Sequence, residues 1–174
     1  MERYLSVIFL LIATLLVGCN DQKGDYIAAS TISANGFAGN AEKIRGLDGQ
    51  EVKVWGFVDH GNLYGDEGAK AILGAWWGGD GPSATSWRFN LKAHAEDAVG
   101  HSFAVHVLND PGRDNLLEAI VTDAKAGKPT QVFVTGRLFT FDAATNRTFL
   151  TGLYMEVRSS ADILLELPEE KRQQ

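Results

Sequence analysis

The stretch Gly49-Gln50-Glu51-Val52-Lys53-Val54-Trp55-Gly56-Phe57-Val58 decides the fold of this chain. Small apolar residues occupy every second position from Val52 to Val58, and a period of two is typical of a β-strand with one buried face. Gly56 interrupts the row of side chains near the middle of the strand. In a flat sheet an interior glycine only weakens the strand, whereas in a small barrel it permits the sharp coil that closure needs. The stretch therefore favours a barrel.

The same alternation recurs in four later segments, which we predict to be strands: 87–91, 102–108, 131–141 and 147–157. Two of them also carry a glycine near the middle, Gly136 and Gly152. The polar loop 142–146 joins the last two strands and predicts a tight connection. Repeated mid-strand glycines favour a barrel over the alternative, a flat α+β sheet built from the same elements.

The spacing of apolar residues changes once along the chain, between the third and fourth predicted strands. Asp110-Pro111 and Asp114 offer alternative helix starts, and Gly127 with Pro129 closes the segment. Between them apolar residues recur at helical spacing, at Leu116, Leu117, Ile120, Val121 and Ala124. We therefore expect a mainly β protein, namely a five-stranded OB-fold Greek-key barrel with one helix between strands 3 and 4.

The entry to this domain resembles a known family. The lead Asn40-Ala41-Glu42-Lys43, followed by a strand of the type Gly-x-x-Val-x-Val-x-Gly-x-Val at 49–58, is similar to the tRNA-anticodon-like OB domains of bacterial envelope proteins. The resemblance covers roughly residues 31–165 as an order of elements. It implies an OB fold and a binding role, and it brings no catalytic set. One departure is the long segment 59–86, where Asp66, Glu67 and Asp80 stand in place of the Lys or Arg of a nucleic-acid binder.

The N-terminus has the parts of a secretory signal. A charged start precedes an apolar run from Leu5 to Val17, which is too short to span a bilayer, and small residues lead to Cys19, the single cysteine. This pattern resembles the lipobox of bacterial lipoproteins, in which the signal is cut before a cysteine that then carries a diacylglyceryl group and palmitate. The alternative is a buried N-terminal helix, but no amphipathic period interrupts the run.

These features divide the chain into four parts. Residues 1–18 form the lipoprotein signal peptide, 19–34 a flexible tether after the lipidated Cys19, part of which can dock, 35–167 the OB-fold-like domain, and 168–174 a solvated tail. We expect the protein to be anchored in the bacterial cell envelope on the periplasmic face. Asn20, rather than Asp, follows the cysteine, which favours the outer membrane over the inner membrane.

The net charge limits the possible ligands, and the cysteine content limits the possible disulfides. The formal net charge is −6, and an acidic surface repels phosphate backbones on average, so nucleic acid is disfavoured as a ligand. With Cys19 lipidated, no thiol remains for a disulfide, and the fold depends on its core alone.

Two groups of residues are candidates for ligand binding. Trp76 and Trp77 lie among glycines in the long loop, where aromatic rings can stack on a base or a sugar; the alternative is that they cap one end of the barrel. The second group lies outward on the strands by alternation: Lys53, Trp55, Arg88, Asn90, Lys92, His106 and Arg137. Ordinary solvent exposure of a half-buried strand is the competing explanation for these residues.

No pattern of an enzyme or a metal site stands out. The four histidines lack ligand spacing, the acidic loop residues lack the Asp-x-Asp-x-Asp-Gly pattern of a calcium loop, and neither Gly-x-Ser-x-Gly nor His-Glu-x-x-His occurs. We therefore expect no metal and no cofactor. The expected function is a non-enzymatic, lipid-anchored OB-fold binding module for an envelope protein, a glycan or an oligonucleotide, in that order. The alternatives are an assembly component of an envelope complex, acting through strand addition, and a hydrolase with an unrecognised site.

Overall fold

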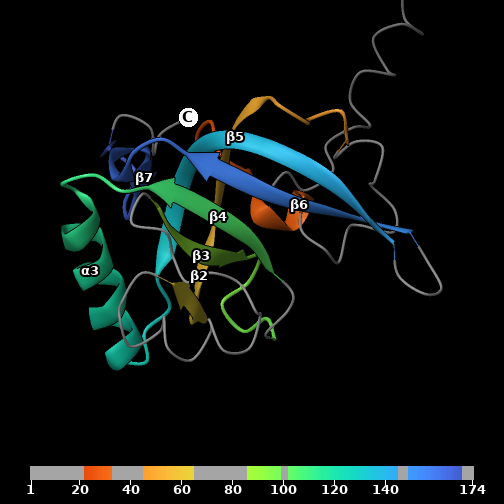
Figure 1. Ribbon diagram of the computed structural model, residues 1–174. Coiled ribbons are helices and arrows are strands. Elements are labelled where there is room, and N and C mark those ends of the chain that lie inside the picture. The colour runs from red at the N-terminus through yellow and green to blue at the C-terminus, as the bar shows by residue number, and fades with distance from the viewer. Residues whose placement is uncertain (1–21, 33–44, 65–85, 99–101, 145–148, 170–174) are drawn as a thin grey trace, which may run out of the picture.

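The alternating stretch around Trp55 forms part of β2 (Glu51–Tyr64), which with β5 (Gln131–Ala144) runs along most of the molecule (Figure 1). The computed structural model describes residues 22–32, 45–64, 86–98, 102–144 and 149–169. The signal peptide, Cys19, Trp76 and Trp77 lie outside these residues. In the described part of the chain, no helix is long and apolar enough to cross a membrane.

Five strands close into a barrel. β3 (Ser86–Lys92), β4 (Ser102–Leu108) and β6 (Phe149–Val157) complete the order β2-β3-β4-β6-β5, and β5 pairs back onto β2. β4 and β6 run parallel, whereas the other neighbours in the barrel are antiparallel. The protein is thus mainly β with a closed five-stranded barrel, consistent with an OB-like arrangement, and the prediction of a barrel over a flat sheet is confirmed.

The core fills the barrel from alternate positions. Buried and half-buried residues alternate without a break along β3 until Lys92, so that Trp87, Phe89 and Leu91 point inward. β4 repeats the pattern with Phe103, Val105 and Val107. This alternation follows from the pleat, which turns successive side chains to opposite faces of the sheet.

The helix α3 (Arg113–Lys125) lies between β4 and β5 and beside one end of the barrel (Figure 1). It contributes Leu116 and Ile120 to the core. Its N-cap residue is Gly112, which has no side chain for capping, and the Asp110 carboxylate instead accepts hydrogen bonds from the backbone N–H groups of Gly112 and Ser160. Asp110 therefore joins the start of α3 to η3 (Ser160–Asp162).

Mid-strand glycines stand where neighbouring strands come closest. A Cβ on Gly56 would lie 2.5 Å from the backbone oxygen of Lys92, and one on Gly136 would lie 2.7 Å from that of Glu156. Such contacts are far inside van der Waals distance, so any side chain at these positions would push the adjoining strand away. This is the physical reason for Gly56 and Gly136: they allow the tight approach that barrel closure requires.

A segment within the expected tether packs against the barrel. β3 pairs with β2 only from Phe57 onward, which leaves the upstream edge of β2 open, and β1 (Ile27–Ala28) pairs with that edge. In the same segment Ile32, which follows η1 (Ala29–Thr31), is fully buried. On β5, the short strand β7 (Ile163–Leu164) pairs at Phe133 and Val134. The packed domain therefore includes residues 22–32.

Candidate functional site

One row of charged and polar side chains runs around the outside of the barrel. Cross-strand pairing places Arg88 on β3 opposite His106 on β4, His106 opposite Glu156 on β6, Glu156 opposite Arg137 on β5, and Arg137 opposite Glu51 on β2. Directly opposed residues share a face of the sheet and have Cβ atoms about 5 Å apart. We call these five residues the charged row.

An aromatic patch lies next to this row. Phe139 on β5 stacks on Tyr154 on β6, with ring centroids 5.3 Å apart and an interplanar angle of 19°. His106 meets Tyr154 edge-on at 5.6 Å, and Phe141 lies 6.3 Å from it. Phe141 is 49% exposed, which is unusual for so large an apolar side chain. The aromatic patch, His106, Phe139, Phe141 and Tyr154, therefore offers rings to a partner on the outer surface.

A hollow of about 480 Å³ adjoins the aromatic patch between β4 and β6. His106, Leu108 and Tyr154 are among its lining residues, and Glu156 and Arg158 contribute charged groups. Leu108 is 53% exposed. We call this space the apolar hollow. Its lining combines apolar residues with a few charged groups.

The electrostatics of the site favour the neutral form of His106. Burial lowers the pKa of its imidazole, Arg88 lowers it further, and the neighbouring Glu156 acts in the opposite direction. A neutral imidazole can both donate and accept a hydrogen bond, and it avoids adding charge next to Arg88. His106 is therefore suited to contact a partner through its ring and one polar nitrogen.

The structure brings together some of the predicted ligand-binding residues and separates others. Arg88, His106 and Arg137 belong to the charged row. Asn90 lies one pair further along, where its amide donates to Ser102 Oγ at 3.1 Å. Lys92 is directed into its own turn, where its ammonium donates to the carbonyl oxygens of Ala95 and Asp97.

Trp55 lies elsewhere, under the N-terminal segment. It is 9% exposed and packs in a second apolar cluster with Tyr26, Ala28, Phe133 and Leu167. The ammonium of Lys23 stands 4.0 Å from the centre of its ring. Alternation correctly places Trp55 on the outside of the barrel strand, but β1 and the C-terminal residues cover it, so it does not face the aromatic patch.

Sequence reasoning missed the aromatic patch on the last two strands. Phe139, Phe141 and Tyr154 were not singled out, nor was Glu156, which connects the patch to the charged row. The alternation along the strands contained this information. Leu138 and Met155 point into the core, so Phe139, Phe141 and Tyr154 fall at positions that point outward. Large rings on an outward strand face would have identified them.

A second polar chain connects α3 to the barrel. His60 Nε2 lies 2.9 Å from Thr130 Oγ1, which donates to Asp123 Oδ2 at 3.1 Å. Burial lowers the pKa of His60, and Lys92 lowers it further, whereas Asp123 and Asp59 oppose the shift. Thr130 is 2% exposed, so its hydroxyl bonds to these two neighbours rather than to solvent. Because Asp123 belongs to α3 and His60 to β2, these bonds hold the C-terminal part of α3 against β2.

Within residues 22–32, 45–64, 86–98, 102–144 and 149–169, no group of three or more His, Cys, Asp or Glu side chains could hold a metal ion. Comparison of the chain with protein-family models, with curated proteins and with solved structures finds no match. The arrangement of its own residues therefore carries the functional argument.

Proposed function

We propose that this chain is a non-enzymatic, lipid-anchored binding module of the bacterial cell envelope, with an OB fold, that faces the periplasm and binds an envelope protein. The observation that carries the proposal is the aromatic patch beside the apolar hollow, where Phe141 and Leu108 are about half exposed. Such a surface costs solvation free energy when it is left in water, and a partner that covers it recovers that cost.

The composition of the site supports a protein partner. Protein interfaces typically have an aromatic or apolar centre, a polar rim, and an enrichment in Tyr and Arg. Here Tyr154 and Leu108 provide the centre, while Arg88 and Glu156 provide a rim of both signs. A partner with complementary charges would be oriented by this rim.

The same charges argue against an oligonucleotide. A nucleic-acid site needs a continuous positive surface along the phosphate backbone. In the charged row, Arg137 has Glu51 on one side and Glu156 on the other. This alternation, together with the net charge of −6, leaves no such track in the row.

The lipid anchor would hold the barrel close to the membrane. Gln22, the first described residue, follows Cys19 by three positions, a reach of about 10 Å in extended chain. Residues 22–32 are packed on the barrel, so little free tether remains between the domain and a lipidated Cys19. Asn20 favours the outer membrane. This proposal predicts that the cleaved form of the Cys19→Ala protein leaves the membrane fraction, and retention of that cleaved form there would contradict the anchor.

Site-directed photo-cross-linking tests the binding role. A photoreactive amino acid at Leu108, in cells, is expected to give an adduct with a specific envelope protein, and Tyr154→Ala in the same chain is expected to abolish it. The matched control is the same photoreactive group at Glu118, an exposed position on α3. Adducts of equal yield and identity at both positions, or an adduct unaffected by Tyr154→Ala, would contradict the proposal.

A glycan is the second candidate, and one observation favours it. The Phe139 and Tyr154 rings form a stacked pair with polar groups close by, and sugars pack on such rings while their hydroxyls bond to the rim. If the adduct formed at Leu108 contained no protein and disappeared after digestion of the cell wall, the result would support a glycan over a protein partner.

A further inference from the structure

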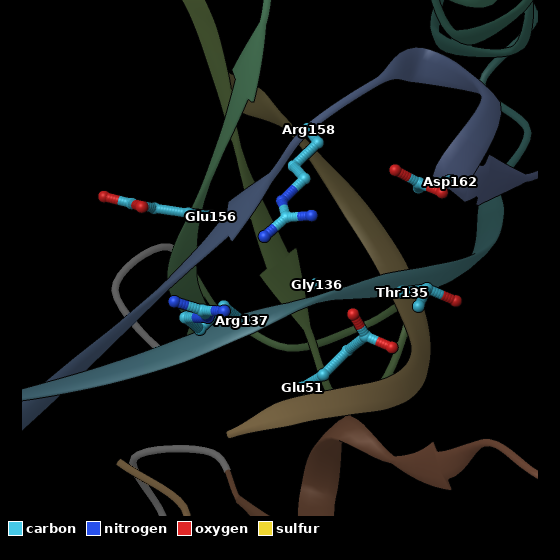
Figure 2. Close-up of a pocket in the computed structure, with 7 residues that line it drawn as sticks. All are labelled: Glu51, Thr135, Gly136, Arg137, Glu156, Arg158 and Asp162. Atoms are coloured by element: carbon cyan, nitrogen blue, oxygen red, sulfur yellow. The ribbon is translucent and has the colours of Figure 1, made fainter. Parts of the chain in front are cut away.

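A second, more highly charged hollow shares Glu156 and Arg158 with the apolar hollow. It has a volume of about 220 Å³ and is lined by Glu51, Thr135, Gly136, Arg137, Glu156, Arg158 and Asp162 (Figure 2). At about 30 Å³ per water this corresponds to about seven waters, enough for a molecule of six or seven heavy atoms. We call it the charged hollow.

Its two arginines make no bond with the rest of the described chain. Arg137 stands directly opposite Glu51 on one side and Glu156 on the other. Even so, within the described ranges, no hydrogen bond or ion pair involves the side chain of Arg137 or Arg158, and the structure's ion pairs lie elsewhere. Two guanidinium groups, each with five N–H donors, therefore remain available to a ligand.

The carboxylates of the charged hollow lie apart from these guanidinium groups. Figure 2 shows the Arg158 guanidinium extending toward the centre, with Arg137 and Glu51 below it and Asp162 to the right, while Glu156 extends away to the left. Two guanidinium groups and the carboxylates of Glu51 and Asp162 thus border the space, and Glu156, which also lines it, brings the count to three formal negative charges against two positive ones.

This charge pattern selects among small ligands. A simple anion would meet the carboxylates of Glu51 and Asp162, and a simple cation would meet the two guanidinium groups, so each would gain one attraction and suffer one repulsion. A molecule with a carboxylate and an ammonium on one carbon satisfies both sets. Arginine is well suited to the carboxylate, because its fork of donors matches the two oxygens.

We propose that the charged hollow binds the zwitterionic head group of a free α-amino acid, with the carboxylate held by Arg137 and Arg158 and the ammonium held by Glu51 and Asp162. Thr135 also lines the space, and its hydroxyl lies 3.4 Å from the hydroxyl of Tyr26. Glu156 and Arg158 line both hollows, but no residue of the aromatic patch lines this one, so its ligand can be tested in the absence of the proposed protein partner.

The test is a ¹H–¹⁵N NMR titration of the full chain in detergent micelles with three probes: alanine, propionate and ethylammonium. The last two are alanine without its ammonium and without its carboxylate. Alanine is expected to shift the amides of Gly136 and Arg137 saturably, with the amide of Gly127, an exposed residue after α3, as an internal control. Each singly charged probe is expected to bind at least about tenfold more weakly.

Variants sharpen the result. Arg137→Gln is expected to weaken alanine binding about tenfold, since one charge-assisted contact is lost, while Arg113→Gln on α3 is expected to leave it unchanged. Glu51→Gln should weaken alanine but strengthen propionate, because it removes a repulsion from the anion. Equal binding of alanine and propionate, or no saturable shift with any probe, would overturn the proposal. Neither outcome would change the cross-linking expected at Leu108.

Discussion

The ring of Phe141 lies against the backbone of Gly152 across the β5–β6 hairpin. The two residues are cross-strand partners, and a Cβ on Gly152 would stand 2.2 Å from Cζ of Phe141. Gly152 thus provides the surface that the most exposed ring of the aromatic patch contacts. At Gly136, by contrast, the absence of a Cβ leaves space for the backbone of the neighbouring strand.

The two glycines should therefore respond differently to alanine. In Gly152→Ala the half-exposed Phe141 ring can swing into solvent, so we expect a loss of about 1 kcal/mol in the free energy of unfolding. In Gly136→Ala the obstacle is the backbone oxygen of Glu156, and we expect a loss of about 3 kcal/mol. Urea unfolding of both variants measures the difference, and equal losses would contradict it.

Stability should fall in mild acid because of His106. Burial and Arg88 lower the pKa of His106 from 6.5 in the folded protein, so the unfolded chain takes up its proton at higher pH. The contribution to stability is complete above about pH 6.5 and is lost as the pH falls through the folded-state pKa. Urea unfolding at pH 7.5 and pH 5.5, about one unit above and below 6.5, measures this loss. Between these two pH values, we expect the free energy of unfolding to decrease less for His106→Gln than for the unaltered protein.

His60 provides a control for this measurement. Its pKa is also lowered, mainly by burial, so part of the acid sensitivity should remain in His106→Gln. The double variant with His60→Gln should lose more of the pH dependence than either single variant. A pH dependence that is the same in all four proteins would mean that neither imidazole is responsible.

Asp110 should matter more than the neighbouring Asp114. Burial acts to raise the pKa of Asp110, but hydrogen bonds from Ser160, Ser159 and Gly112 outweigh it, so the pKa is lowered. Asp110→Ala removes these bonds and should cost about 1 to 2 kcal/mol of unfolding free energy above pH 5, roughly one unit over the ordinary carboxyl pKa. Stability from this carboxylate is lost as the pH falls through its lowered pKa.

The matched control is Asp114→Ala on the first turn of α3. Asp114 pairs with Arg113 at 2.8 Å, but its side chain is 78% exposed, so the pair contributes less than about 1 kcal/mol. If Asp114→Ala proved as destabilising as Asp110→Ala, the connection from Asp110 to Ser160 would not be what holds the start of the helix.

The N-terminal segment should behave as part of the domain. Tyr26 is 3% exposed and packs edge-on against Phe133 at 5.4 Å, so Tyr26→Ala should cost about 3 kcal/mol. Asp25→Ala removes the exposed ion pair with Lys53 and should cost less than about 1 kcal/mol. Thermal unfolding compares the two, and a Tyr26→Ala protein as stable as the unaltered one would show that this segment contributes no stability.

Much of the barrel was predictable, because the inward and outward positions of a strand follow from the period of two alone. Val54 and Phe89 alternate with polar or aromatic neighbours, Val105 lies between Ala104 and His106, and each of the three is buried as expected. The switch to helical spacing between Leu116 and Ile120 likewise identified α3. The packing of segment 22–32 was harder to predict from the sequence. It depends on which part of the β2 edge β3 leaves unpaired, and only the folded barrel defines that.

The sequence by itself determined the inward positions of the barrel strands and that the barrel must close tightly at Gly56 and Gly136, since both follow from local periodicity and side-chain size. Only the tertiary structure decided which outward residues become neighbours. His106 and Glu156 lie 50 positions apart in the chain, and the parallel pairing of β4 with β6 brings them together. Strand register depends on the closed barrel as a whole, so the aromatic patch and the charged hollow exist only in the folded protein.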